Sequence, residues 1–180
     1  MSDENYTSLD EQTFNNYPNL VSLRLIQLKL NFIHPTALSH LYALKELSLC
    51  CNNLTLLHPL TFSGLVQLEK IKLHMNQIDF LAPDTFHGLV QLKKINLSAN
   101  RLKSINFDTF KGLSMLKEIN LSSNRLESID ARVFSDALKL KKLSLGQNPI
   151  SQMRPDFVKK LLSSTHPTCD IDISDGCVIS

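Results

Sequence analysis

A unit of 24 residues repeats along most of the chain, and this repeat constrains the fold more than any other feature. The stretch INLSAN at 95–100 returns as INLSSN at 119–124. In each unit a leading Leu is followed by two apolar positions that alternate with other residues. These columns are Leu20, Leu44, Leu68, Leu92, Leu116 and Leu140; Leu23, Leu47, Ile71, Ile95, Ile119 and Leu143; and Leu25, Leu49, Leu73, Leu97, Leu121 and Leu145. Six copies of one short strand are therefore predicted.

The alternation of apolar residues at period two gives each unit a strand with one buried face. Only the next unit can cover that face, so a single unit cannot fold alone. Consecutive strands must lie parallel, about 4.8 Å apart, while the rest of each unit returns on the other side. We therefore expect a coil with one parallel sheet of about six strands and an irregular, mostly non-helical return side.

Two further columns are predicted to hold neighbouring turns together. An unbonded amide inside an apolar stack costs roughly 1–3 kcal/mol, so a recurring Asn should bridge backbone groups of adjacent turns as a ladder. A recurring Phe should stack beneath the return side as a spine. The ladder is Asn52, Asn76, Asn100, Asn124 and Asn148, and the spine is Phe62, Phe86, Phe110 and Phe134.

The units fit the pattern LxxLxLxxNxLxxLxxxxFxGLxx, which resembles the 24-residue, Phe-containing class of leucine-rich repeats found in Toll and Toll-like receptor ectodomains. The resemblance implies an α/β repeat fold, a curved right-handed solenoid with a concave parallel sheet. It divides the chain into a partial N-terminal repeat or cap at 1–19, the solenoid at 20–162, and a C-terminal tail or small cap at 163–180. It also implies recognition of a ligand, most often on the concave sheet, in an innate-immune or cell-surface receptor.

Toll-type receptors usually carry Cys-rich caps, a signal sequence and a downstream membrane span. None of these features can be recognised in the sequence. The chain is therefore expected to be a fragment of a longer protein, a truncated paralogue or an intracellular relative.

Residues between the leucines of each strand should face outward and form the concave surface. A local basic cluster beside one apolar residue stands out there and favours an acidic or anionic partner. Strand lysines can instead serve only to keep the sheet solvated and to discourage edge pairing, and both interpretations stay open. The candidate ligand-binding residues are Arg24, Lys70, Lys72, His74, Met75 and Lys94.

The sequence offers no sign of catalysis. It contains no HExxH, no Cys-x-x-Cys and no Gly-rich phosphate loop, so no catalytic residue, metal site or cofactor is predicted. A formal net charge of +2 is too small to attract and bind nucleic acid. We expect a non-enzymatic binding module with a protein ligand; the alternative is a structural spacer in a longer repeat array.

The four cysteines fall into two separate groups. Cys50 and Cys51 lie in the second unit, about 20 Å from the region of Cys169 and Cys177 after the last unit. Disulfide Cα atoms lie within about 7 Å, so only a Cys169–Cys177 bridge remains plausible. That bridge favours an oxidising compartment, whereas two adjacent unpaired thiols favour a reducing one.

Two kinds of modification motif point to opposite compartments. The ending CVIS fits a farnesylation box at Cys177 and supports an alternative, a cytoplasmic scaffold tethered to membrane. The sequons at Asn5 and Asn53 favour an extracellular or cell-surface glycoprotein that is part of a longer chain. Further sequons at Asn96 and Asn120 arise from the repeat itself. The extracellular location is the preferred prediction, and membrane contact is expected only through a larger parent chain or through a lipid on Cys177.

Overall fold

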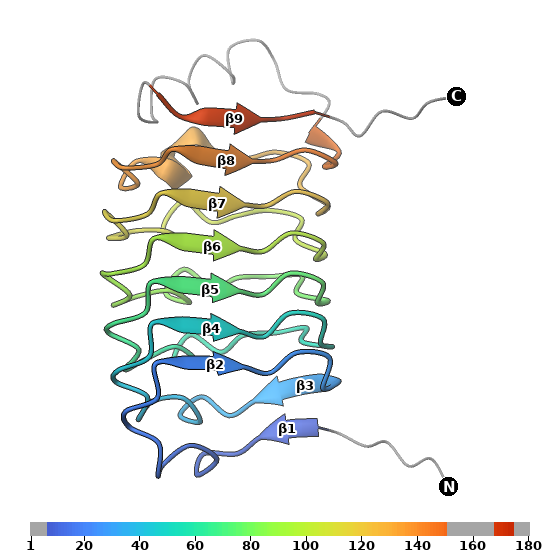
Figure 1. Ribbon diagram of the computed structural model, residues 1–180. Helices are drawn as coiled ribbons and strands as arrows, with labels where there is room; N and C mark the ends of the chain where they lie inside the picture. The colour runs from blue at the N-terminus through green and yellow to red at the C-terminus, as the bar shows by residue number, and fades with distance from the viewer. Residues whose placement is uncertain (1–6, 151–167, 175–180) are drawn as a thin grey trace, which may run out of the picture.

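The computed structural model describes residues 7–150 and 168–174, and most of its strands stack into one parallel sheet (Figure 1). Every neighbouring pair in the main sheet is parallel. The strands are β2 (Ser22–Arg24), β4 (Glu46–Ser48), β5 (Lys70–Lys72), β6 (Lys94–Asn96), β7 (Glu118–Asn120), β8 (Lys142–Ser144) and β9 (Asp170–Asp172). The return side of the described residues holds one short 3-10 helix, η1 (Ala131–Phe134). The predicted solenoid with a mostly non-helical return side is confirmed.

The main sheet has seven strands, one more than the six that the repeat predicts. The additional strand, β9, pairs with β8 through Leu143 and Ile171 and lies in the segment predicted to be a tail or small cap. Cys169 and Ile171 pack against the core. The open edge of β8 offers backbone hydrogen bonds to any extended segment, so β9 needs no repeat motif.

A second, two-stranded sheet lies on the return side of the first turns, below β2 in Figure 1. It pairs β1 (Thr7–Leu9) with β3 (Leu30–Ile33) in parallel, with Leu9 opposite Ile33. Leu9, Leu30 and Ile33 are buried. The partial unit before the first strand therefore covers the return side, while β2 remains at the edge of the main sheet.

Stacked phenylalanine rings run through the interior beneath the return side. Ring centroids of Phe62 and Phe86 are 5.8 Å apart, those of Phe86 and Phe110 6.0 Å, and those of Phe110 and Phe134 6.3 Å. All four rings are buried, and Leu38 is buried in the equivalent slot of the preceding turn. The rings therefore form a continuous apolar column across four turns.

The recurring asparagines are buried and bonded to the backbone of two turns. Asn100 Oδ1 accepts a hydrogen bond from Ile78 N at 3.0 Å, and Asn100 Nδ2 donates to the carbonyl oxygens of Leu73 and Leu97, each at 3.0 Å. The other members of the column, Asn52, Asn76, Asn124 and Asn148, repeat this pattern. Each amide satisfies backbone groups that the turn would otherwise leave unpaired.

No helix among residues 7–150 and 168–174 is both long and apolar enough to cross a membrane.

Candidate functional site

The parallel pairing arranges the outward side chains of the main sheet into rows that cross its strands. Residues in equivalent slots of adjacent turns lie side by side. The first concave row is Ser22, Glu46, Lys70, Lys94, Glu118, Lys142 and Asp170. The second concave row is Arg24, Ser48, Lys72, Asn96, Asn120, Ser144 and Asp172. Both signs of charge therefore occur on this face.

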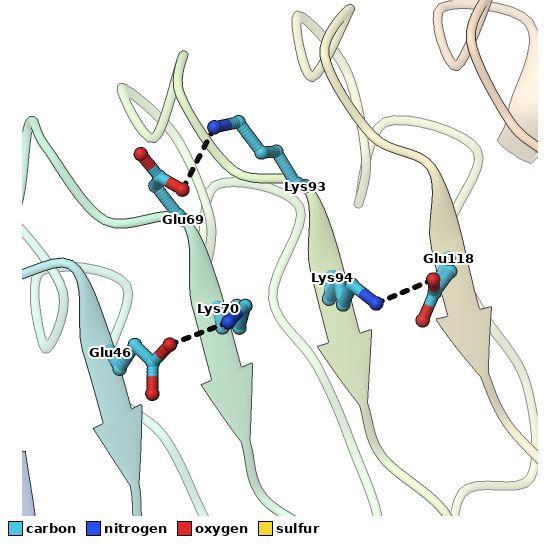
Figure 2. Close-up of polar contacts among 6 residues, drawn as sticks. All are labelled: Glu46, Glu69, Lys70, Lys93, Lys94 and Glu118. Atoms are coloured by element: carbon cyan, nitrogen blue, oxygen red, sulfur yellow. Dashed lines mark hydrogen bonds and ion pairs between the residues drawn. The ribbon is translucent and has the colours of Figure 1, made fainter.

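Two of the predicted ligand-binding lysines already have acidic partners on neighbouring strands (Figure 2). Lys70 Nζ lies 2.5 Å from Glu46 Oε1, and Lys94 Nζ lies 2.6 Å from Glu118 Oε1. The hydrogen bond from Lys70 holds the pKa of the Glu46 carboxyl below its usual value, and Glu46 in turn raises the pKa of Lys70. The predicted basic cluster is thus partly neutralised by glutamates that each lie 24 residues away from their lysine.

Lys72 is the exposed cation at the centre of the predicted cluster. Among the described residues it makes no ion pair, and it lies between Ser48 and Asn96 in the second concave row. Arg24 is exposed in the same row, two strands away. Met75 is exposed next to the half-buried His74. Of the predicted contact residues, Lys72 and Arg24 therefore keep the most accessible charge.

A group of sulfur and imidazole side chains lies just beyond the ends of β4 and β5. The Sγ atoms of Cys50 and Cys51 and a ring nitrogen of His74 all lie within 4.8 Å of one another. Cys50, which the alternation places outward, is buried with 6% of its surface exposed. Burial, followed by the neighbouring Cys50, raises the pKa of the Cys51 thiol, and burial lowers the pKa of His74.

The sequence prediction of no metal site did not anticipate this group, because the three residues form no contiguous motif. The available signal was positional: Cys50 and His74 occupy the same slot of adjacent units. Among residues 7–150 and 168–174, Cys50, Cys51 and His74 are the group of three His, Cys or carboxylate side chains that lie close enough together to hold a metal ion.

Several predicted modification sites depend on residues outside the described ranges. Cys177 and Asn5 both lie there, so the disulfide, the lipid and the first sequon stay predictions. Cys169 is half-buried, and burial raises the pKa of its thiol. Asn53 is exposed, and its backbone N–H donates to Leu30 O at 2.8 Å. Its side chain is therefore accessible for a glycan.

Two exposed apolar columns lie outside the concave rows, and the sequence interpretation missed them. The Phe32 column consists of Phe32, Leu56 and Phe80, which are 52%, 61% and 51% exposed. The Val66 column consists of Tyr42, Val66, Val90 and Leu138, all exposed. Each set recurs in one slot of the repeat, so the 24-residue alignment contained the signal. Exposed apolar patches of this kind often mark interaction surfaces.

The family model described as leucine rich repeat matches residues 42–102 and 90–150. A search of curated proteins found no match. Among solved structures, the chain is similar to TLR13 in its complex with ssRNA13, with 31% identity over 79% of this chain and 20% of that chain, at a TM-score of 0.75.

Two other solved structures extend the likeness over more of the chain. One is the glycosylated form of the Drosophila Toll–Spatzle complex, with 26% identity over 93% of this chain and 23% of that chain, at a TM-score of 0.83. The other is a protein of Leptospira interrogans, with 25% identity over 90% of this chain and 39% of that chain, at a TM-score of 0.77. The chain thus spans well under half the length of each of these proteins.

Proposed function

The chain belongs to the leucine-rich repeat family, and we propose that it is a non-enzymatic recognition module that binds a protein ligand on its concave sheet. One observation carries the proposal: the two concave rows present side chains of both charge signs in fixed register. The basic members are Arg24, Lys70, Lys72, Lys94 and Lys142, and the acidic members are Glu46, Glu118, Asp170 and Asp172.

The mixed charge of these rows favours a protein over a nucleic acid. Phosphate backbones are held by fields of one positive sign, whereas protein partners meet interleaved charges with complementary ones. TLR13 was solved with ssRNA13 and Toll with Spatzle, so relatives of this fold accept both classes of ligand. In this chain, the ion pairs of Lys70 and Lys94 reduce the positive field on the concave face.

We propose that Lys72 and Arg24 make the principal charged contacts, with His74 and Met75 beside them. Lys70 and Lys94 contribute mainly through their aliphatic stems, because their ammonium groups are held by glutamates. An acidic group of the ligand near Lys72 would complete the charge balance of the second concave row.

The concave sheet alone is too small for a standard interface. Strands about 4.8 Å apart give a face of about 450 Å², whereas a stable partner covers about 800 Å² on each side. The ligand must therefore also contact other surfaces. The Phe32 column and the Val66 column offer exposed apolar side chains for this purpose.

We propose an extracellular or cell-surface location, in keeping with the likeness to Toll and the accessible Asn53. Mass spectrometry of the protein from its natural source tests this location. A glycan on Asn53 supports it, and a farnesyl group on Cys177 supports the cytoplasmic, membrane-tethered alternative.

A photoreactive cross-linker at Asn96, in the centre of the concave face, tests the binding surface. The matched control carries the same group at Lys111, which is exposed in the return segment. With a panel of purified extracellular proteins and a single-stranded RNA, we expect a protein to be cross-linked from residue 96, little cross-linking from residue 111, and a strong loss on Lys72→Glu. Equal capture from both positions, capture of RNA alone, or turnover of a substrate by the chain contradicts the proposal.

A further inference from the structure

We propose that Cys50, Cys51, His74 and Met75 form a binding site for a single thiophilic metal ion, and that Cu⁺ fits this site best. The site shares His74 and Met75 with the protein-binding surface proposed above, but its test needs no protein ligand. The proposal concerns the end of β4 and β5, where side chains of two adjacent turns converge.

The register of the two turns brings the four side chains together. Leu49 N donates to Lys72 O at 2.8 Å, and Cys51 N donates to His74 O at 3.0 Å, so the pairing of β4 and β5 continues past the strands. Residues 24 apart therefore remain adjacent up to the ladder asparagines.

The backbone conformation at Cys51 allows both thiols to face one place. Consecutive side chains of a regular strand point to opposite faces, which would separate the sulfur atoms of adjacent cysteines. Cys51 instead has φ of 59°, and Met75 in the next turn has φ of 55°. The left-handed residue turns the chain, and both thiols come within 4.8 Å of each other and of the His74 ring.

The spacing of the donor atoms suits one ion. Sulfur ligands at about 2.3 Å from a tetrahedral centre lie about 3.8 Å from each other. Cys51 Sγ lies 3.7 Å from Met75 Sδ, close to that separation. The ligand atoms of Cys50, Cys51 and His74 lie within 4.8 Å of one another, about 1 Å more than that separation at most.

The imidazole has an unused buried nitrogen. His74 Nδ1 is buried and has no hydrogen-bond partner among the described residues, a state that costs free energy. Coordination of an ion through this nitrogen would remove that cost. The nitrogen belongs to the same ring that lies within reach of both thiols.

The donor set and the surrounding charge favour Cu⁺ over Zn²⁺. Two thiolates and a thioether are soft ligands, and a thioether ligand is typical of copper sites rather than zinc sites. Binding releases both thiol protons to solvent without any change in the oxidation state of the copper, and the resulting Cu⁺ dithiolate carries one negative charge. Lys72, which makes no ion pair among the described residues, lines the same hollow of about 250 Å³ as Cys50 and His74 and can balance it.

The repeat fold does not require Cys, His or Met at the positions of this site. The slots of Cys50 and Cys51 hold Ser98 and Ala99 two turns later, and Ser122 and Ser123 in the following turn. The solenoid forms in those turns without sulfur or imidazole. A requirement of the fold therefore does not explain why three sulfur donors and an imidazole lie together here.

Anaerobic titration of the purified, reduced chain with Cu⁺ against a chromophoric copper chelator tests the proposal. We expect one tightly held equivalent, with affinity reduced about 100-fold or more in Cys50→Ser and Cys51→Ser, amounting to about 2.7 kcal/mol. Met75→Leu should reduce Cu⁺ affinity about tenfold and leave Zn²⁺ affinity unchanged, because Zn²⁺ makes little use of a thioether. The matched control, Cys169→Ser with Cys177→Ser, removes two thiols elsewhere and should leave binding unchanged.

X-ray absorption of the copper-loaded native chain provides a measurement that needs no variant, and it should show sulfur and imidazole ligands on one copper. Loss of copper binding when Cys169 and Cys177 are replaced by Ser overturns the proposal. Unchanged copper affinity in the Cys50→Ser and Cys51→Ser variants overturns it as well. Tighter binding of Zn²⁺ with no response to Met75→Leu overturns the assignment of copper. A Cys50–Cys51 disulfide in protein from its natural source overturns the site as a whole.

Discussion

The interior and the concave face of this solenoid follow different rules, although the same repeat builds both. In the interior, four consecutive turns place a Phe in the same slot and five place an Asn in the same slot. On the concave face, a single slot holds Cys50, His74 and Ser98 in three consecutive turns. Interior positions must fit the turns above and below, whereas concave positions meet solvent or a ligand. Chemistry specific to this chain therefore lies where the repeat is broken.

The largest effect is expected from the interior aromatic column. Phe86→Ala removes a buried ring stacked between Phe62 and Phe110 and leaves a cavity, so the free energy of unfolding should fall by about 3–5 kcal/mol. Urea unfolding followed by circular dichroism measures this change. Phe80→Ala is the control, because Phe80 is exposed on an adjacent stretch of the same turn and should change stability by no more than about 0.5 kcal/mol. Equal losses would show that the buried column has no special role.

The next effect compares two asparagines of one turn. Asn100→Ala leaves Ile78 N and the carbonyls of Leu73 and Leu97 without their partners, and should cost about 3 kcal/mol. Asn96→Ala on the concave face loses only two local hydrogen bonds, from Ser98 N and Ser98 Oγ, and should cost less than about 1 kcal/mol. Thermal and urea unfolding of both variants provide the comparison. If Asn96→Ala is the more destabilising change, the ladder does not hold the turns together.

A smaller effect should separate two glycines that share a slot of the repeat. Gly64 and Gly88 have φ of 88° and 81°, so an Ala at either place is strained. A Cβ at Gly64 would also lie 2.3 Å from Ser39 O, whereas nothing lies within 4 Å at Gly88. Gly64→Ala should therefore lower the free energy of unfolding by about 1–3 kcal/mol more than Gly88→Ala. Equal losses in the two variants would show that the strain of the turn, rather than contact with the preceding turn, sets the cost.

The smallest effect concerns the ion pairs of the concave face. The pKa of Glu46 is lower in the folded chain than in the unfolded one. The ionised carboxylate therefore contributes to the free energy of unfolding above the unfolded pKa, and this contribution disappears as pH falls through the folded pKa. Glu46→Gln should therefore reduce slightly the loss of stability between about pH 5 and about pH 3. Glu127→Gln is the control, because Glu127 is exposed and makes no ion pair among the described residues. Identical pH profiles for all three proteins would show that the pair with Lys70 adds nothing to folding.

The interior could be predicted because each of its side chains repeats. The columns of Leu47 and Ile71, of Asn76, and of Phe86 recur every 24 residues, and such a pattern buries its apolar side only when the turns stack. The seventh strand could not be predicted in this way. The pair of Leu143 with Ile171 spans 28 positions and falls outside the repeat, although apolar residues alternate there.

The sequence by itself determined the solenoid, its parallel sheet and the identity of its interior columns, because every turn must match the next. Tertiary structure decided which different side chains meet across turns. It paired Lys70 with Glu46, buried Cys50, and brought Cys51 within reach of His74 and Met75. Such contacts depend on strand register, on the direction of each side chain and on local turns such as the left-handed residue at Cys51. A residue pattern records the slot of a side chain, and only the folded backbone sets the distance between two slots.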